Sequence, residues 1–197
     1  MFTYVFGVSS ERESVHFLVS EFVSCRPGEA SSMTLQDALD RPTELLMKDY
    51  EYINVLHEVA TGVHYLHAQH ILHNDIKTDN VLVYRTADPR AKARAKLIDL
   101  GNACWESRPA CFDVDSSRSS HIAPEVAVGG PVSSYSDIYS FGYLAGNVDD
   151  HPGQVVAERP CVKAIADGCV KQARPTDRMT LGAIIRLLAD AEAKPPA

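Results

Sequence analysis

The 197-residue sequence has no long apolar run and no paired cysteine motif. Its cysteines, at positions 25, 104, 111, 161 and 169, include no C-x-x-C pair, a spacing that suits neither a zinc site nor a disulfide framework. No apolar stretch approaches the roughly 20 residues that cross a bilayer, and the N-terminus lacks the basic and then apolar pattern of a secretion signal. We therefore expect a soluble protein with reduced thiols and no membrane partner, located in the cytoplasm or the nucleus.

Basic residues are too few to indicate a nucleic-acid partner. The formal net charge is -7, and no stripe of lysine and arginine is interleaved with aromatic side chains. A basic cluster at Arg90, Lys92, Arg94 and Lys96 leads into a predicted strand, and we interpret the cluster as a solvated loop. The content of 45% hydrophobic and 23% charged residues is that of an ordinary globular domain.

Periodicity and turn residues predict a small β element followed by a mostly helical unit. Residues 4–8 and 15–22 are rich in strand-forming side chains, and the polar residues between them predict a hairpin. Thr34, with Asp37 three positions later, predicts the N-cap of a short helix. Apolar residues at intervals of three and four predict a long helix over 48–68. Three further helices are expected at about 134–146, 162–169 and 181–193.

The segment from His70 to Tyr84 gathers polar chemistry in one short loop. It reads His-Asn-Asp-Ile-Lys-Thr-Asp-Asn over residues 73–80, and the apolar residues 81–84 that follow predict a buried strand. A second apolar stretch, residues 96–101, ends in Asp-Leu-Gly. A lone Asp or Asn in a loop is most often part of an Asx turn. The joint spacing of these residues, rather than any one of them, indicates a functional site.

This spacing resembles the H-R-D-x-K-x-x-N and D-F-G signatures of the protein kinase family, with Asn74 in place of Arg and Leu100 in place of Phe. The residues 123–125 (Ala-Pro-Glu), 137–142 and 169–178 resemble three later motifs of the same family, in the same order. The resemblance implies an α+β kinase-like fold with a mostly helical C-terminal lobe and a truncated N-terminal β element. Residues 1–23 would hold the last two N-lobe strands and the hinge, 24–193 the C-lobe, and 194–197 a tail.

The resemblance also implies roles for individual residues. Asp75 would be the catalytic base and Lys77 would contact the γ-phosphate of ATP, while Asn80 and Asp99 would hold Mg²⁺. The residues that contact the nucleotide would be Glu21, Val23, Asn80, Leu82 and Asp99. Lysine at position 77 is the pattern of serine/threonine kinases, so the implied substrate is a protein serine or threonine hydroxyl.

Some residues have implied structural roles. His73 would brace the loop against the glycine-bearing turn, and Glu125 and Arg178 would form a buried ion pair. Leu100 would occupy an apolar packing position. Asn74 carries no charge, so it cannot pair with a phosphorylated activation loop as an arginine does.

The sequence also departs from the family pattern. No G-x-G-x-x-G occurs, and the first lysine is Lys48, beyond the expected hinge. The glycine-rich loop and the phosphate-anchoring lysine are therefore missing. A fragment or incomplete gene model, a truncated isoform and a degenerate pseudokinase all remain possible explanations. The intact Asp75, Lys77, Asn80 and Asp99 favour a fragment of an active lineage.

Three functions follow from these observations. The first is a protein kinase and the second is a catalytically inactive kinase-like binding module. The third is a phosphotransferase with a small-molecule acceptor, against which the Ala-Pro-Glu motif and Arg178 weigh.

Overall fold

The computed structural model describes residues 5–8, 18–112, 120–151 and 160–193. Within these ranges the chain is mainly helical, and its strands form three separate antiparallel pairs, β1–β2, β3–β6 and β4–β5. This confirms the α+β class. The elements are β1 (Val5–Val8), β2 (Leu18–Ser20), α1 (Leu35–Asp40), α2 (Pro42–Leu45), α3 (Asp49–Ala68), β3 (Ile71–Leu72), the 3₁₀ turn η1 (Thr78–Asn80), β4 (Val81–Tyr84), β5 (Arg94–Leu97), β6 (Cys104–Trp105), α4 (Pro124–Ala127), α5 (Ser134–Asp149), α6 (Pro160–Val170), the 3₁₀ turn η2 (Pro175–Asp177) and α7 (Leu181–Glu192).

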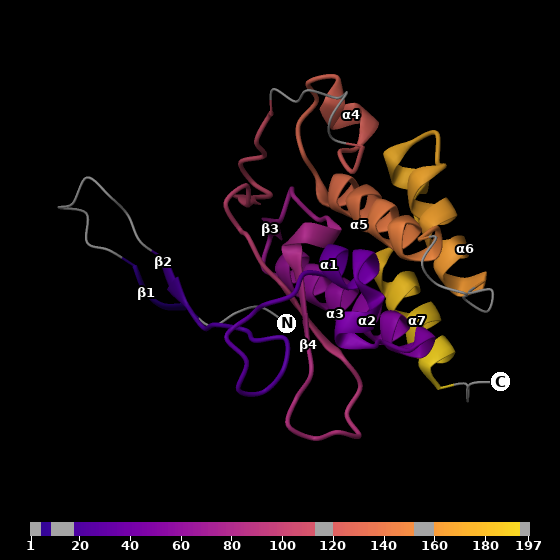
Figure 1. Cartoon of the computed structure of the whole chain (residues 1–197). Helices are drawn as coiled ribbons and strands as arrows, with labels where there is room; N and C mark the ends of the chain where they lie inside the picture. Colours follow the sequence, from indigo (N-terminus) through magenta and orange to yellow (C-terminus); the bar gives the residue numbers. More distant parts are fainter. Residues whose placement is uncertain (1–4, 9–17, 113–119, 152–159, 194–197) are drawn as a thin grey trace.

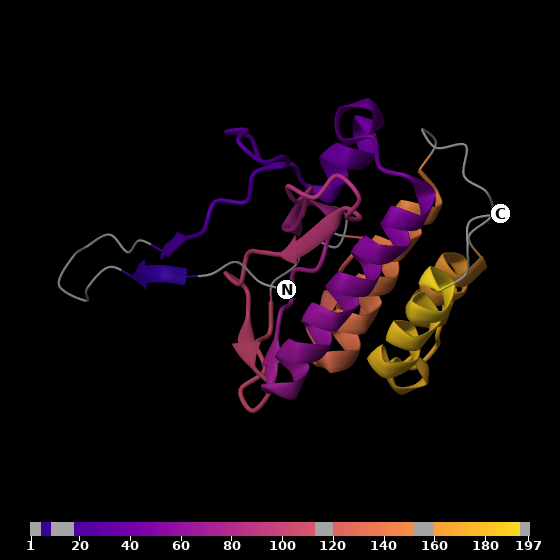
Figure 2. The same ribbon diagram turned by 90° about the horizontal axis from the view of Figure 1, so that it is seen from below.

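Helices α3, α5, α6 and α7 pack together and form the body of the molecule (Figure 1). Their contact faces carry fully buried apolar side chains such as Leu56, Phe141, Leu144 and Ile184. Burial of each side chain of this size stabilises the fold by about 1.5–3 kcal/mol. The antiparallel β1–β2 pair stands apart from this helical body in both views (Figures 1 and 2).

The predicted helix signals near the N-terminus are confirmed. The Thr34 hydroxyl accepts from the backbone N–H of Asp37 at 3.0 Å, and the Asp37 carboxylate accepts from the N–H of Thr34 at 3.0 Å, which is a capping box. The long helix α3 begins at Asp49. Of its predicted apolar stripe, Leu56, Val59, Val63 and Leu66 are buried and Ile53 is partly buried against the core.

The interpretation of the basic cluster as a solvated loop is wrong for two of its members. Arg94 and Lys96 lie in β5, which pairs with β4 in the register Val81↔Leu97. Arg94 pairs with Glu58 on α3, and the buried side chain of Lys96 pairs with Glu21. Each cation therefore meets a carboxylate that lies far away in the sequence, which explains how these side chains are accommodated in a packed strand.

Other features of the fold differ from the sequence-based predictions in smaller ways. The run 81–84, which predicted a buried strand, forms β4, and its residues alternate between buried and partly buried. The short elements α2, α4, β3 and β6 were not predicted, and the predicted hairpin turn lies outside the described residues. No disulfide joins any of the five cysteines, all of which lie in the described residues. In the described segments no helix is long and apolar enough to span a membrane.

The predicted ion pair between Glu125 and Arg178 is confirmed. The guanidinium donates two hydrogen bonds to the carboxylate, at 2.6 and 2.7 Å, and a third to the carbonyl of Tyr135 at 2.9 Å. Arg178 is only 5% exposed, and its guanidinium also lies over the ring of Tyr139. Burial by itself would raise the pKa of Glu125. The hydrogen bonds from Arg178, the hydrogen bond from the backbone N–H of Glu125 and the charge of Arg178 together outweigh burial, so the pKa is lowered overall. The pair fastens α4 to the segment that precedes α7.

Replacing Glu125 with alanine would leave the Arg178 guanidinium buried without its counter-ion. We expect Glu125→Ala to lower the free energy of unfolding by about 2–4 kcal/mol at neutral pH, as measured by urea denaturation. The pKa of Glu125 is lowered in the fold, so the pair contributes its full stabilisation at pH values above 4.5, the ordinary pKa of this side chain. This contribution is lost as the pH falls through the folded-state pKa. The difference between the two proteins should therefore shrink in acid.

The matched control is Asp167→Ala, which removes an exposed pair with Lys171. It should unfold like the parent. If Glu125→Ala were as stable as the parent, the stabilising role of the pair would be refuted.

Candidate active site

The loop between β3 and β4 brings three of the predicted site residues together. One oxygen of the Asp75 carboxylate, Oδ2, accepts from Lys77 Nζ at 2.9 Å and from Asn80 Nδ2 at 3.0 Å. The η1 turn makes this possible, since it folds Asn80 back toward the start of the loop, where its amide also donates to the backbone carbonyl of Asp75. The predicted clustering of Asp75, Lys77 and Asn80 thus matches the geometry.

Asp75 has a third side-chain neighbour that the sequence did not indicate. Its other oxygen, Oδ1, lies 3.1 Å from Nε2 of His121, a residue of the segment that leads into α4. The hydrogen bond from His121 is the main cause that lowers the pKa of Asp75; burial opposes it, and Lys77 and Asn80 add to it. The carboxylate is therefore ionised at neutral pH and can accept a proton.

The backbone of the loop is held by a buried carboxylate on α5. Asp137, with no exposed surface, accepts from the N–H of His73 at 2.9 Å and from the N–H of Asn74 at 2.8 Å. His67, at the end of α3, lies 2.9 Å from the same carboxylate. Asn74 has a positive φ of 67°, which asparagine tolerates better than most residues. One side chain therefore fixes the backbone directly before Asp75.

His73 braces the loop as predicted. Its buried ring lies 3.1 Å from the carbonyl of Ile98 through Nε2, and its Nδ1 faces the N–H of Asp75 at 3.3 Å. A carbonyl can only accept and an N–H can only donate, so Nε2 carries the proton and Nδ1 does not. Burial lowers the pKa of His73, which agrees with this neutral tautomer.

The predicted metal ligands Asn80 and Asp99 lie at the same end of the β4–β5 pair. Val81 pairs with Leu97, and the N–H of Ile98 donates to the carbonyl of Asn80 at 2.9 Å, so Asp99 follows directly at this end. Asp99 is exposed, has a φ of 63°, and accepts from the N–H of Gly101 at 3.1 Å.

The donor set at this end of the sheet suits magnesium. Carboxylate and amide oxygens are hard ligands, and Mg²⁺ usually takes one or two of them and completes its shell with phosphates and water. In the described part of the chain no group of three or more His, Cys, Asp or Glu side chains could hold a metal by itself. A site built from Asn80 and Asp99 would thus need oxygen ligands from a bound phosphate.

The predicted nucleotide contacts near the hinge are only partly brought together. Leu82 is opposite Lys96 in the β4–β5 register, and Lys96 pairs with Glu21, so these residues share one region. Val23 is buried.

Leu100 does not occupy the packing position expected for it: it is 48% exposed and belongs to neither hydrophobic cluster of the described residues.

Asn74 connects the loop to the turn after Asp99. Its side-chain amide donates to the carbonyl of Asn102 at 2.8 Å and lies 3.3 Å from the sulfur of Cys104. Its Oδ1 is buried and has no hydrogen-bond partner among the described atoms, beside a space of about 10 Å³, enough for about one water molecule. A neutral amide therefore makes short-range hydrogen bonds where the family pattern has an arginine.

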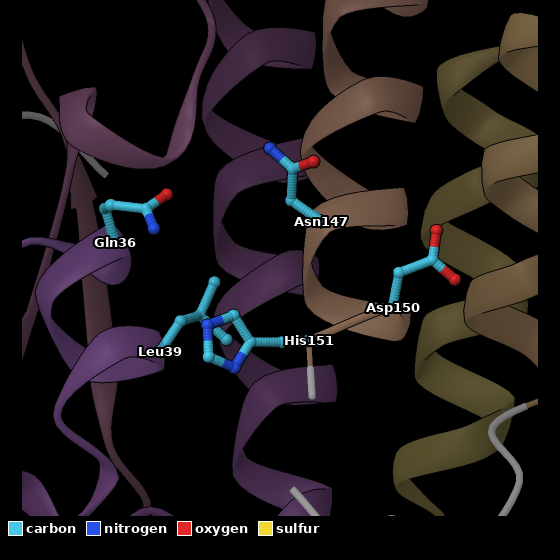
Figure 3. Close-up of a pocket in the computed structure, with 5 residues that line it drawn as sticks. All are labelled: Gln36, Leu39, Asn147, Asp150 and His151. Atoms are coloured by element: carbon cyan, nitrogen blue, oxygen red, sulfur yellow. The ribbon is translucent and has the colours of Figure 1, made fainter. Parts of the chain in front are cut away.

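A depression of about 270 Å³ lies between α1 and the C-terminal end of α5 (Figure 3). Its lining residues are Gln36, Leu39, Asn147, Asp150 and His151. Gln36 accepts a hydrogen bond from the hydroxyl of Thr78 at 2.6 Å, so this depression adjoins the same loop that carries Asp75.

Sequence reasoning missed two residues of the site. Asp137 belongs to one of the recognised motifs, and its position at the start of a helix with an apolar face was the signal available. His121 precedes the Ala-Pro-Glu motif, but nothing in its neighbourhood marks it as a partner of a residue 46 positions earlier.

Removal of the Asp137 carboxylate should loosen the loop. We expect Asp137→Ala to lower the free energy of unfolding by about 3 kcal/mol or more, because two buried N–H groups lose their acceptor. Hydrogen exchange, followed by NMR or mass spectrometry, should become faster at the amides of His73 and Asn74 than elsewhere. The exposed aspartate Asp190 provides the control: Asp190→Ala should change neither. Unchanged exchange at the two amides in Asp137→Ala would contradict the anchoring role.

Comparison with known proteins agrees with this site. The sequence matches the protein kinase domain family over residues 4–151. It is 29% identical over 166 residues to the dual specificity protein kinase zakA of Dictyostelium discoideum, which covers 80% of this chain and 20% of that protein. It is 34% identical over 119 residues to the serine/threonine-protein kinase PSK1 of Saccharomyces cerevisiae, which covers 59% of this chain and 8% of that protein. The chain thus spans a fifth or less of the length of these curated relatives. Since the family match extends over most of the chain, the α+β fold is a protein kinase fold and the chain belongs to the protein kinase family.

Proposed function

We propose that the protein transfers the γ-phosphoryl group of ATP to serine or threonine hydroxyls of other proteins. The observation that carries the proposal is the Asp75 carboxylate, ionised and held by Lys77 and Asn80 at the end of the β4–β5 pair where Asp99 also lies. Family membership supports the reaction class. The serine/threonine preference rests on Lys77 alone, and the relatives include a kinase named as dual specificity.

In the proposed reaction, Asp75 accepts the proton of the substrate hydroxyl. The hydroxyl oxygen forms a bond to the γ-phosphorus, and the bond from that phosphorus to the bridging oxygen breaks, so ADP leaves with the electron pair. Lys77 has two tasks in this step. It orients the carboxylate through Oδ2, and its positive charge lies where it can offset the charge of the transferred group.

Asn80 and Asp99 are the proposed ligands of Mg²⁺. The ion would neutralise charge on the β- and γ-phosphates when it is bound with ATP. The side chain of Asn80 can serve both partners, because its Nδ2 donates to Asp75 while its Oδ1 is a separate oxygen ligand. The adenine side of the site is proposed at Glu21, Val23 and Leu82.

The proposed division of the chain follows from this site. Residues 1–23 supply the hinge side, residues 24–193 the lobe with the catalytic and metal loops, and 194–197 a tail. Because the sequence has no glycine-rich loop and no lysine before Lys48, the contacts proposed here come from the hinge and the two loops alone. The cytoplasmic or nuclear location stays a prediction.

Binding of the nucleotide can be tested by thermal stability. A ligand that binds the native state at 100 times its Kd stabilises it by ~2.7 kcal/mol, which is roughly 5–10 °C for a domain of this size. We expect ATP with Mg²⁺ to raise the Tm of the purified protein, and Asp99→Ala to lose most of the magnesium-dependent part of that rise. Asp190→Ala should keep it. The absence of any rise at millimolar ATP and Mg²⁺ would exclude nucleotide binding and the enzymatic function with it.

Transfer can be tested apart from binding. We expect Asp75→Asn to lower the transfer of radioactive phosphate from ATP to myelin basic protein by about 100-fold or more, since an amide cannot accept the proton. The same variant should keep the ATP-dependent rise in Tm. A protein that binds ATP but transfers no phosphate in any variant would instead be a catalytically inactive, kinase-like binding module.

A further inference from the structure

His121 is held against the proposed catalytic base by residues 120–123, the segment that leads into α4. Its Nε2 is 3.1 Å from Asp75 Oδ1. The contact is well shielded from water, since the side chain of His121 is 15% exposed and that of Asp75 is 12% exposed. A hydrogen bond in such a setting is stronger than the same bond at the surface.

The backbone on both sides of this contact is fixed by the same helix. Ser140 of α5 donates from its hydroxyl to the carbonyl of His121 at 2.7 Å. Asp137, one turn earlier on α5, holds the two backbone N–H groups that precede Asp75. The helix therefore sets the distance between His121 and Asp75, and the contact does not depend on two side chains meeting by chance.

The hydrogen bonds leave one defined acceptor position on the carboxylate. Each carboxylate oxygen accepts about two hydrogen bonds. Oδ2 already accepts from Lys77 Nζ and Asn80 Nδ2, so both of its positions are occupied. Oδ1 accepts from His121 and retains one position. That position is the one open to a substrate hydroxyl.

We propose that His121 is a positioning residue for phosphoryl transfer, which orients the carboxylate of Asp75 so that Oδ1 receives the proton of the substrate hydroxyl. This inference rests on the proposed function, and it adds a residue of the segment before α4 to the catalytic arrangement. It links the order of that segment to the chemistry, because displacement of His121 would free the Asp75 carboxylate to rotate. Loss of the contact should lower kcat, whereas the affinity for ATP should change little.

The contact itself has a readout that does not require activity. An ionised carboxylate can only accept, so Nε2 of His121 must carry a proton. Long-range ¹H–¹⁵N spectra of the full chain at about pH 8 should show the Nε2-protonated form for this ring, with its signals identified by their loss in His121→Gln. An Nε2 without a proton would overturn the inference.

The catalytic role is tested by two variants that differ in one hydrogen-bond donor. His121→Phe keeps a ring of similar shape without an N–H, while His121→Gln places an amide N–H at a similar reach. We expect His121→Phe to lower kcat by roughly 10- to 100-fold with the KM for ATP within about twofold, and His121→Gln to recover most of kcat. His64→Phe, at an exposed position of α3, should behave like the parent.

The outcomes separate this inference from the proposed function. If the parent transfers phosphate and His121→Phe does so equally well, the inference is overturned while the proposed function stands. If His121→Phe does not fold, the test rests on His121→Gln. A folded His121→Gln whose kcat is roughly 10- to 100-fold below that of the parent overturns the inference, and a kcat near that of the parent supports it. If the parent transfers no phosphate, the proposed function fails and the catalytic role of His121 fails with it, even where the spectra show the contact.

Discussion

The buried carboxylate of Asp137 is the interaction on which the arrangement of the site depends. It has no exposed surface, and burial of a charge is costly unless hydrogen bonds compensate for it. The compensation comes from the N–H groups of His73 and Asn74 and from the ring of His67. In return, the carboxylate stabilises a loop backbone that includes a left-handed residue, Asn74, a conformation that most side chains disfavour. The hydrogen bonds that offset the cost of burying Asp137 thus also fix the geometry of the loop.

Helix α5 extends this control to the rest of the site. Ser140 holds the carbonyl of His121, and the carbonyl of Tyr135 accepts from Arg178, which in turn binds Glu125 at the start of α4. The loop that carries Asp75 and the segment that carries His121 therefore share a single support in the core of the helical body. Interiors are close-packed and deform little, so a frame of this kind keeps the distance between the two segments within narrow limits.

Sequence reasoning was reliable where the signal is local. The capping box at Thr34, the start of α3 and the clustering of Asp75, Lys77 and Asn80 all depend on residues within a few positions of each other. A distant pair was predicted where family motifs mark both partners, as for Glu125 and Arg178. Prediction failed where the partner is distant and no motif links the two residues. Lys96 meets Glu21 across 75 positions, and His121 meets Asp75 across 46, and neither pair leaves a periodic or spacing pattern in the sequence. Only the packing of the segments on α5 and on the β4–β5 pair brings them together.

Strand register aligns the two halves of the proposed chemistry, which His73 and Asn74 also join through hydrogen bonds. Asp75 and Asn80 belong to one loop, whereas Asp99 follows a different strand, and the pairing of Val81 with Leu97 is what brings Asn80 and Asp99 to the same end. A slip of one residue would exchange the two faces of β5 and move Asp99 away from Asn80. Ala95 and Leu97 of β5 belong to the hydrophobic core cluster, whereas Lys96 between them pairs with Glu21, so such a slip would also turn the charge of Lys96 toward the core. The hydrophobic pattern of two four-residue strands therefore protects the relative placement of the base and the metal ligands.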